Sequence, residues 1–218
     1  MLGLTAISAK RPLRVLCLAA HSDDLEIGCA GTLIEWAKAQ RGLSVTWAIL
    51  SADGARAAEA QRSVTRLLGR IADVRVSLAD FRDGHFPGVF SEIKTWFEQL
   101  ARSVRPDVIL THRLEDRHQD HRLIAEITWQ TFRDHLILEY EVPKYEGDLG
   151  HPNLFVPLRA ATARRKVDHL LRSFGSQRAR HWFDERTFLG LMRLRGLECR
   201  AASGLAEAFH VRKVVLQP

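Results

Sequence analysis

The sequence is poor in cysteine and has no long hydrophobic run. Its 218 residues include three cysteines, an odd number without a C-x-x-C pair, and this usage is typical of a reducing compartment. The first residues form neither a secretory signal peptide nor a transmembrane helix, because Lys10 and Arg11 follow a few apolar residues and the next apolar run is short. We therefore expect a cytoplasmic protein without a membrane-inserted segment.

The chain also has fewer acidic than basic residues. The chain has 32 Lys and Arg against 26 Asp and Glu, a net charge of +6, which raises nucleic acid as a partner. The arginines are scattered, however, and the densest groups fall in expected helices around 159–166 and 193–200. We interpret these groups as solvated helix faces and do not expect nucleic acid as a partner. An interface between copies of the chain, giving a homo-oligomer, stays open.

Repeats, low-complexity segments and linkers are absent as well, so we expect a single domain over residues 1–218. Strand and helix patterns alternate in units of about thirty residues, which predicts an α/β fold, a Rossmann-like and mostly parallel sheet with helices on both faces. This core covers 13–135, with strands at 13–20, 43–50, 74–78 and 106–111 and helices at 26–40, 55–68, 90–103 and 121–132. Residues 136–218 form a C-terminal extension, with strands at 136–142, 153–156 and 210–216 and helices at 160–174 and 179–195.

The turn after the first strand lacks the G-x-G-x-x-G fingerprint of a dinucleotide site. It reads A-H-S-D-D-L-E-I-G-C-A-G-T over residues 20–32, and two carboxylates at this place would repel a pyrophosphate. Gly28 and Gly31 fall inside the following helix, where they permit close packing. The side chains of His21, Asp23 and Asp24 suit a cation instead. A catalytic zinc takes three protein ligands and leaves one position for water, so a further ligand is expected at the end of another strand.

A second polar cluster follows the strand at 106–111. Residues 112–121 read H-R-L-E-D-R-H-Q-D-H. His118 and His121 are three positions apart, so a helical turn places them on one side, with Asp120 between them. The carboxyl ends of parallel strands meet at one edge of the sheet, where such folds bind their ligands. The two clusters together therefore predict one metal site.

The two clusters resemble the signatures of the PIG-L/LmbE-like zinc-dependent N-deacetylases, the N-acetylglucosaminyl-type deacetylases. Members of that family commonly read A-H-P-D-D and later H-P-D-H, where this chain has A-H-S-D-D and H-Q-D-H. The stretches S-A-D-G-A-R-A-A-E-A (51–60) and G-L-A-E-A-F (204–209) extend the resemblance over most of the chain. The chain has Ser22 and Gln119 where proline is usual, and Leu25, followed by Glu26, where many members have glutamate. Some members show a similar D-D-aliphatic-E-I-G arrangement, and position 119 carries no chemistry, so these departures do not count against activity.

The resemblance implies a role for each polar residue of the two motifs. It implies that zinc is bound by His21, Asp24 and His121. Asp23 is the general base, His118 polarises the substrate carbonyl or stabilises the oxyanion, and Asp120 orients His118. A neighbouring carboxylate would keep His118 protonated. Two histidines and one carboxylate also suit ferrous iron, so Fe²⁺ remains an alternative to zinc.

Arg56 and Asp83 resemble positions that hold substrate hydroxyls in relatives. Arg56 can equally be a surface residue near a helix N-terminus, and Asp83 a turn residue. For His85 and His112 a surface or internally satisfied histidine is the simpler interpretation. His151 and Glu207 either border the substrate beside the expected metal site or have only structural roles.

The implied reaction is hydrolysis of an N-acetyl group on an amino sugar or sugar conjugate, giving acetate and a free amine. A small-molecule N-acetyl sugar or conjugate is therefore the expected partner. One alternative is a same-family amidase that acts on a thiol-sugar conjugate. Another is a non-catalytic sugar-binding protein of the same fold, against which Asp23 and His118 argue, because a binder needs neither.

Overall fold

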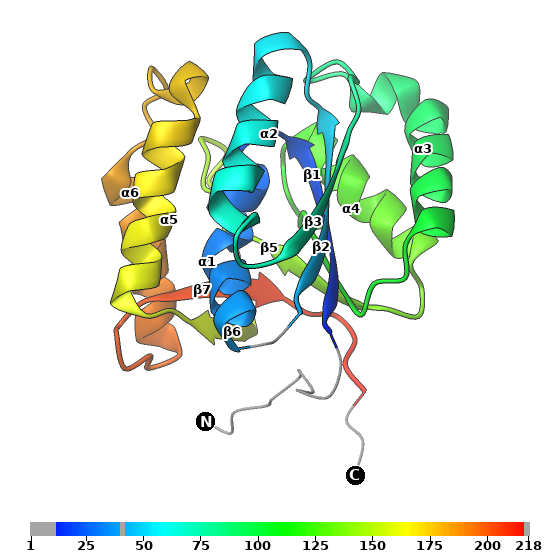
Figure 1. Ribbon diagram of the computed structural model, residues 1–218. Coiled ribbons are helices and arrows are strands. Elements are labelled where there is room, and N and C mark those ends of the chain that lie inside the picture. The colour runs from blue at the N-terminus through cyan, green and yellow to red at the C-terminus, as the bar shows by residue number, and fades with distance from the viewer. Residues whose placement is uncertain (1–11, 40–41, 216–218) are drawn as a thin grey trace.

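A single seven-stranded sheet forms the centre of the molecule (Figure 1). The computed structural model describes residues 12–39 and 42–215. The strands are β1 (Arg14–His21), β2 (Ser44–Ser51), β3 (Asp73–Leu78), β4 (Val108–Thr111), β5 (Leu136–Tyr140), β6 (Leu154–Pro157) and β7 (Ala206–His210). The helices are α1 (Asp24–Ala39), α2 (Gly54–Leu68), α3 (Phe90–Ser103), α4 (Gln119–Thr131), α5 (Ala160–Ser173) and α6 (Glu185–Glu198), with short 3-10 turns η1 (Phe86–Val89) and η2 (Gly175–Gln177).

The strands follow the order β3-β2-β1-β4-β5-β7-β6. All pairs from β3 to β5 are parallel, whereas β7 is antiparallel to both β5 and β6. The predicted Rossmann-like sheet is thus confirmed, and its parallel part continues one strand beyond residue 135. The strands of the C-terminal extension join the same sheet. The chain leaves β1 toward β2 on one side and later returns to β4 on the other, so β1 and β4 flank the point where the strand order reverses.

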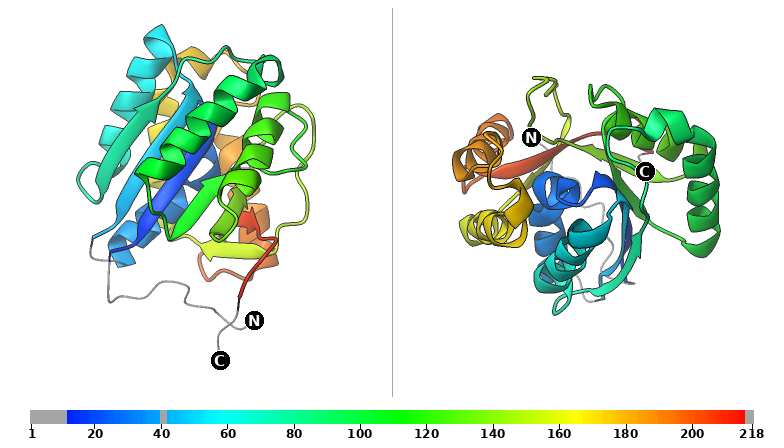
Figure 2. Two further views of the ribbon diagram at one scale, coloured as in Figure 1. Left: turned by 90° about the vertical axis from the view of Figure 1, so that its right-hand side faces the viewer. Right: turned by 90° about the horizontal axis from the view of Figure 1, so that it is seen from above.

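Helices cover both faces of the sheet, as the alternating pattern predicts. Helices α1, α2, α5 and α6 lie on one face, and α3 and α4 lie on the other (Figures 1 and 2). Strand β1 is buried between these layers, because its alternate side chains enter two different hydrophobic clusters. Val15, Cys17 and Ala19 belong to the cluster beneath α1, α2, α5 and α6, and Leu16, Leu18 and Ala20 to that beneath α3 and α4. The continuous apolar run before His21 follows from this double burial.

Two predicted elements of the extension are misplaced. The last strand is 206–210 and not 210–216, because 206–210 already pairs with β5 and β6. Val214 and Val215, which suggested the later strand, are exposed, and residue 216 lies outside the described residues. Helix α6 begins at Glu185 and not at 179, because Asp184 caps it by accepting a hydrogen bond from the backbone N–H of Arg186. The 160–174 helix is confirmed as α5.

None of the described helices combines the length and apolar character that crossing a bilayer requires. Cys17 and Cys29 are buried, Cys199 is half-buried, and all three are free thiols. Cys17 and Cys29 therefore act as small core residues in β1 and α1.

Gly28 lets α1 pack directly on Tyr140. A Cβ at Gly28 would clash with Cδ2 of Tyr140, a fully buried ring whose hydroxyl donates to the carbonyl of Leu18. We expect Gly28→Ala to lower the free energy of unfolding by about 1–3 kcal/mol, measured by urea denaturation. The matched change Gly190→Ala in α6 meets no atom of the described residues within 4 Å outside the backbone of its own helix, and is expected to be neutral or stabilising. Equal stability of the two variants would contradict this account of α1 packing.

Candidate metal centre

The two polar clusters meet at the carboxyl ends of the neighbouring strands β1 and β4. His21 is the last residue of β1, and Asp24 is the first of α1. After β4 the chain forms a loop over 112–118, and His118 caps the N-terminus of α4, one turn before His121. The backbone alone therefore brings the A-H-S-D-D and H-Q-D-H stretches to one point, at the place where the strand order reverses.

The three expected metal ligands converge. Nδ1 of His21 lies 3.2 Å from Nε2 of His121 and 3.5 Å from Oδ2 of Asp24. Nε2 of His121 lies 3.5 Å from Oδ1 of Asp24. Two ligands at about 2.0–2.1 Å from a tetrahedral zinc are separated by roughly 3.3 Å, close to these spacings. Two imidazoles and one carboxylate therefore fit a divalent metal such as zinc or ferrous iron.

Other donors overlap with this set. His118 lies within 4.8 Å of His21 and His121, and His112 is equally close to Asp24 and His121. The ring of His112 is fully buried and stacks on that of His121, with centroids 3.8 Å apart. Because Nε2 of His112 accepts the backbone N–H of Ala20 at 2.9 Å, its lone pair is already engaged. His112 thus joins the centre by stacking on His121 and through Nε2, which lies 3.2 Å from Oδ2 of Asp24. Only its position directly after β4 hinted at this.

The protonation states of Asp24 and His121 suit metal binding. Burial alone would raise the pKa of Asp24, but the adjacent His121, His112 and His21 lower it well below its usual range. Burial, together with the neighbouring His112, lowers the pKa of His121 to about 3. A metal binds ionised carboxylates and neutral imidazoles, so these two side chains are in the required states near neutral pH.

Asp23 lies beside the ligands but makes different contacts. Its side chain is buried, and Oδ2 has no hydrogen-bond partner within the described part of the chain. Burial raises the pKa of Asp23 to about 7, and the negative charge of Asp24 contributes. A carboxyl group with a pKa near 7 and an unengaged oxygen can take up and release a proton near neutral pH.

The contacts of Asp120 differ from the expectation that it orients His118. Its carboxylate accepts the backbone N–H groups of Gly84 and Phe86, at 2.6 and 3.1 Å, and lies 3.3 Å from Nε2 of His21. Only the backbone N–H of Asp120 reaches His118, donating to Nδ1 at 3.3 Å. The carboxylate of Asp120 therefore contacts His21, which sequence spacing does not reveal.

His118 is held as a neutral imidazole. Burial, with the neighbouring His21, lowers the pKa of His118, which favours a neutral ring over the expected protonated one. Because Nδ1 accepts from Asp120, the single proton of the neutral ring is on Nε2. His118 can thus donate one hydrogen bond from Nε2 without being charged.

Arg56 and Asp83 lie together at the edge of the centre. Nη1 of Arg56 is 2.8 Å from Oδ2 of Asp83, and Oδ1 of Asp83 is 3.0 Å from Nε2 of His21. The Asp83 side chain is 46% exposed and that of Arg56 is 28% exposed. The pair is therefore open to solvent on one side and in contact with His21 on the other.

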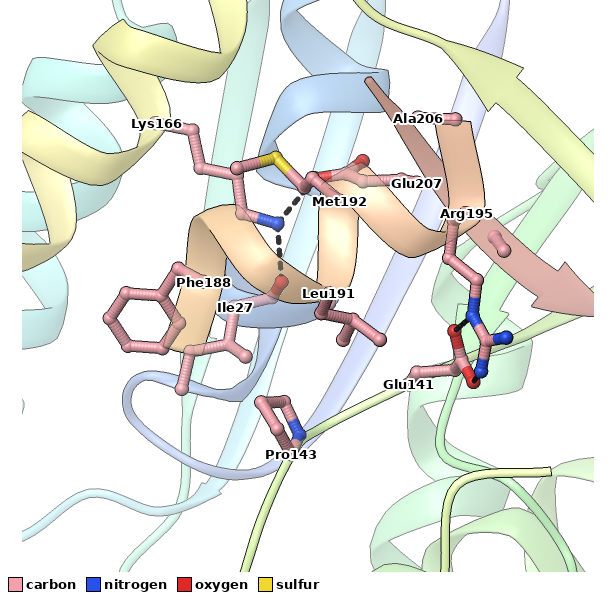
Figure 3. A pocket seen from close by; sticks show the side chains of 12 residues that line it. Ile27, Glu141, Pro143, Lys166, Phe188, Leu191, Met192, Arg195, Ala206 and Glu207 are labelled. Carbon is pink, nitrogen blue, oxygen red and sulfur yellow. Dashed lines mark hydrogen bonds and ion pairs between the residues drawn. The ribbon is translucent and has the colours of Figure 1, made fainter. Parts of the chain in front are cut away.

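Glu207 belongs to the packing of the extension. Figure 3 shows its carboxylate directed toward the ammonium of Lys166, 2.6 Å away, and it also accepts the backbone N–H groups of Gly31 and Thr32. The cavity beside this ion pair measures about 20 Å³, which holds a single water and no sugar. His85 and His151 are exposed and join none of the donor groups around His21.

Two residues outside the expected set lie against the centre. Oδ2 of Asp116 is 3.1 Å from Nδ1 of His121 and 2.9 Å from Nζ of Lys144. Neither sequence spacing nor charge indicated that Asp116 contacts both His121 and Lys144.

A family model and a curated relative that match this chain are both described as deacetylases. Residues 16–132 match the family model described as PIG-L, GlcNAc-PI de-N-acetylase. YaiS of Escherichia coli (strain K12), an uncharacterized deacetylase, is 25% identical over an alignment of 148 residues that covers 62% of this chain and 77% of YaiS.

Two solved structures share the fold. N,N'-diacetylchitobiose deacetylase from Pyrococcus horikoshii has a TM-score of 0.68 at 17% identity, covering 94% of this chain and 87% of its own. GalB, the 4-carboxy-2-hydroxymuconate hydratase from Pseudomonas putida KT2440, has a TM-score of 0.69 at 15% identity. The match covers 94% of this chain and 98% of GalB. The fold thus serves more than one reaction. The match over residues 16–132, more than half of the sequence, shows that the chain belongs to the PIG-L family of deacetylases.

Proposed function

We propose that this protein is a metal-dependent N-deacetylase, which hydrolyses the N-acetyl group of an amino sugar or sugar conjugate to acetate and a free amine. The observation that carries the proposal is the convergence of His21, Asp24 and His121 beside Oδ2 of Asp23, which is buried and has no hydrogen-bond partner among residues 12–39 and 42–215. A sugar-binding protein needs no such carboxyl, and the PIG-L family is one of deacetylases.

His21, Asp24 and His121 would hold the metal, for which zinc is our first proposal and Fe²⁺ the alternative. A bound zinc would polarise the amide carbonyl and lower the pKa of a water molecule. Asp23 takes the proton of the attacking water and returns it to the leaving amine. His118 donates from Nε2 to the carbonyl oxygen as negative charge develops there. Asp120 keeps His21 in place through its contact with Nε2.

Arg56 and Asp83 are proposed to bind the sugar hydroxyls at the open edge of the centre. A hydrogen bond to a charged group contributes about 1.5–3 kcal/mol, so we expect Arg56→Ala to raise KM by roughly tenfold or more, with a smaller change in kcat. Arg62→Ala, on the exposed side of the same helix, is the matched control and should leave both constants unchanged. An unchanged KM in Arg56→Ala would remove this residue from the binding site.

The proposed reaction is tested by measuring acetate release from a panel of compounds. The panel contains N-acetylglucosamine, N,N'-diacetylchitobiose and glycosides of N-acetylglucosamine, chosen because the family model and the Pyrococcus protein are named for such substrates. A thiol-sugar conjugate tests the alternative amidase. Zinc-loaded and iron-loaded protein are compared with chelator-treated protein. Binding of an N-acetyl sugar by loaded protein without any acetate release would favour the non-catalytic alternative.

A further inference from the structure

We propose that Asp116 is a positioning residue of the metal centre, which fixes the ring of His121. Lys144, from the C-terminal extension, contacts the same carboxylate. This inference rests on the metal site of the proposed function. It adds a carboxylate and a loop that neither sequence motif contains.

The carboxylate of Asp116 is fully engaged. Oδ1 accepts the backbone N–H of His118 at 2.8 Å, and Oδ2 lies 3.1 Å from Nδ1 of His121 and 2.9 Å from Nζ of Lys144. The residue is 5% exposed. One buried carboxylate thus holds the backbone at His118 and the side chain of His121, which lie one turn apart at the start of α4.

The contact with Nδ1 determines which nitrogen of His121 is available. An ionised carboxylate only accepts hydrogen bonds, so Nδ1 of His121 carries the proton and Nε2 keeps its lone pair. Nε2 is the atom that lies 3.2 Å from Nδ1 of His21 and 3.5 Å from Oδ1 of Asp24. Asp116 therefore fixes both the tautomer and the orientation of His121 that the ligand set requires. Such contacts behind a ligating histidine typically change metal affinity 10–100-fold.

Lys144 belongs to the segment that follows β5. Its ammonium donates to Asp116, to Oδ1 of Asp148 at 2.8 Å and to the carbonyl of Val142. Asp148 in the same segment also contacts the 112–118 loop. Its backbone carbonyl accepts a hydrogen bond from the side chain of Arg113, and its Oδ2 accepts one from the backbone N–H of Arg117. The residues behind His121 therefore come from both parts of the chain, and the extension helps to shape the metal centre.

A merely structural role and a positioning role predict different results for two variants. Asp116→Asn removes the charged acceptor of His121 but keeps the shape of the side chain. Lys144→Met removes one anchor of the loop, yet it keeps the contact between Asp116 and His121 and deletes a positive charge near the cation. If Asp116 positions His121, zinc affinity falls in the first variant only. If the network only anchors the loop, the two variants change together.

The test is zinc affinity of the full-length protein, measured by competition with a chromophoric chelator. We expect Asp116→Asn to bind zinc 10–100-fold more weakly than wild type and Lys144→Met to bind no more weakly than wild type. Asp107→Asn is the control, because its ion pair with Arg14 lies at the opposite end of β4 and should not affect zinc. Urea unfolding of each metal-free variant measures any loss of stability separately.

Wild-type affinity in Asp116→Asn would overturn the inference, as would equal losses of affinity in Asp116→Asn and Lys144→Met. Wild-type protein that binds neither zinc nor iron would contradict the proposed function instead. A second measurement needs no variant and covers the case in which Asp116→Asn does not fold. Nitrogen-15 NMR of zinc-loaded wild type should show His121 with its proton on Nδ1, and a proton on Nε2 would overturn the inference.

Discussion

Asp23→Asn is expected to lower kcat for acetate release by about 10²–10⁴-fold while the bound metal stays at the wild-type level. Asn has nearly the shape of Asp but cannot take a proton from water. Burial raises the pKa of Asp23 to about 7, and Oδ2 has no protein partner among the described residues, so the group is prepared for proton transfer and not for holding the fold. The measurement is steady-state kinetics at full metal occupancy.

Asp24→Asn is the matched comparison for this prediction. Asp24 lies 3.5 Å from the ring nitrogens of both His21 and His121, so its loss should reduce metal content as well as turnover. The two variants would then assign different roles to the adjacent aspartates, proton transfer to Asp23 and metal binding to Asp24. Wild-type turnover in Asp23→Asn at full occupancy would remove the general base from the proposed mechanism.

Glu207→Ala is expected to cost about 3–5 kcal/mol of folding free energy, the largest stability effect that we predict. The substitution leaves the ammonium of Lys166 buried without its carboxylate, 2.6 Å away in the wild type. It also removes the acceptor of the Gly31 and Thr32 N–H groups inside α1. The measurement is urea denaturation of the metal-free protein, which keeps metal binding out of the comparison.

Lys166→Met provides the control. It removes the ammonium, but Glu207 keeps two backbone donors, so we expect a smaller loss of stability than in Glu207→Ala. Similar stability of Glu207→Ala and wild type would show that this ion pair does not hold α1, α5 and β7 together. The late G-L-A-E-A-F stretch is explained in this way as packing of the extension against the helix that follows His21.

The meeting of the two polar clusters could be predicted from sequence, because local spacing and sheet topology suffice to place them. The choice of His21, Asp24 and His121 as ligands rests on the family resemblance and stays a prediction. His21 and Asp24 follow a strand directly, His121 follows the next parallel strand in space, and parallel strands bring their carboxyl ends together. The same logic placed Gly28 and Gly31 inside α1, where both lie.

The contacts behind the ligands could not be predicted in this way. Asp120 is two residues from His118 in the chain. Its carboxylate nevertheless accepts hydrogen bonds from the backbone of the 84–86 segment and contacts the ring of His21. The contact of Asp116 with Lys144 depends on how two irregular loops pack. The end of β7 was missed for a related reason, since strand propensity at 211–215 is outweighed by pairing that is already complete at 206–210.

The central claim is that two distant stretches form one metal site, and metal content tests it most directly. Protein purified without added metal is measured for zinc and iron, beside His121→Ala. We predict about one metal ion per chain in wild type and nearly none in the variant, because the ligand set loses one of its three members. A wild-type protein that stays metal-free after zinc or iron is supplied, or a His121→Ala variant that keeps its metal, would contradict the account.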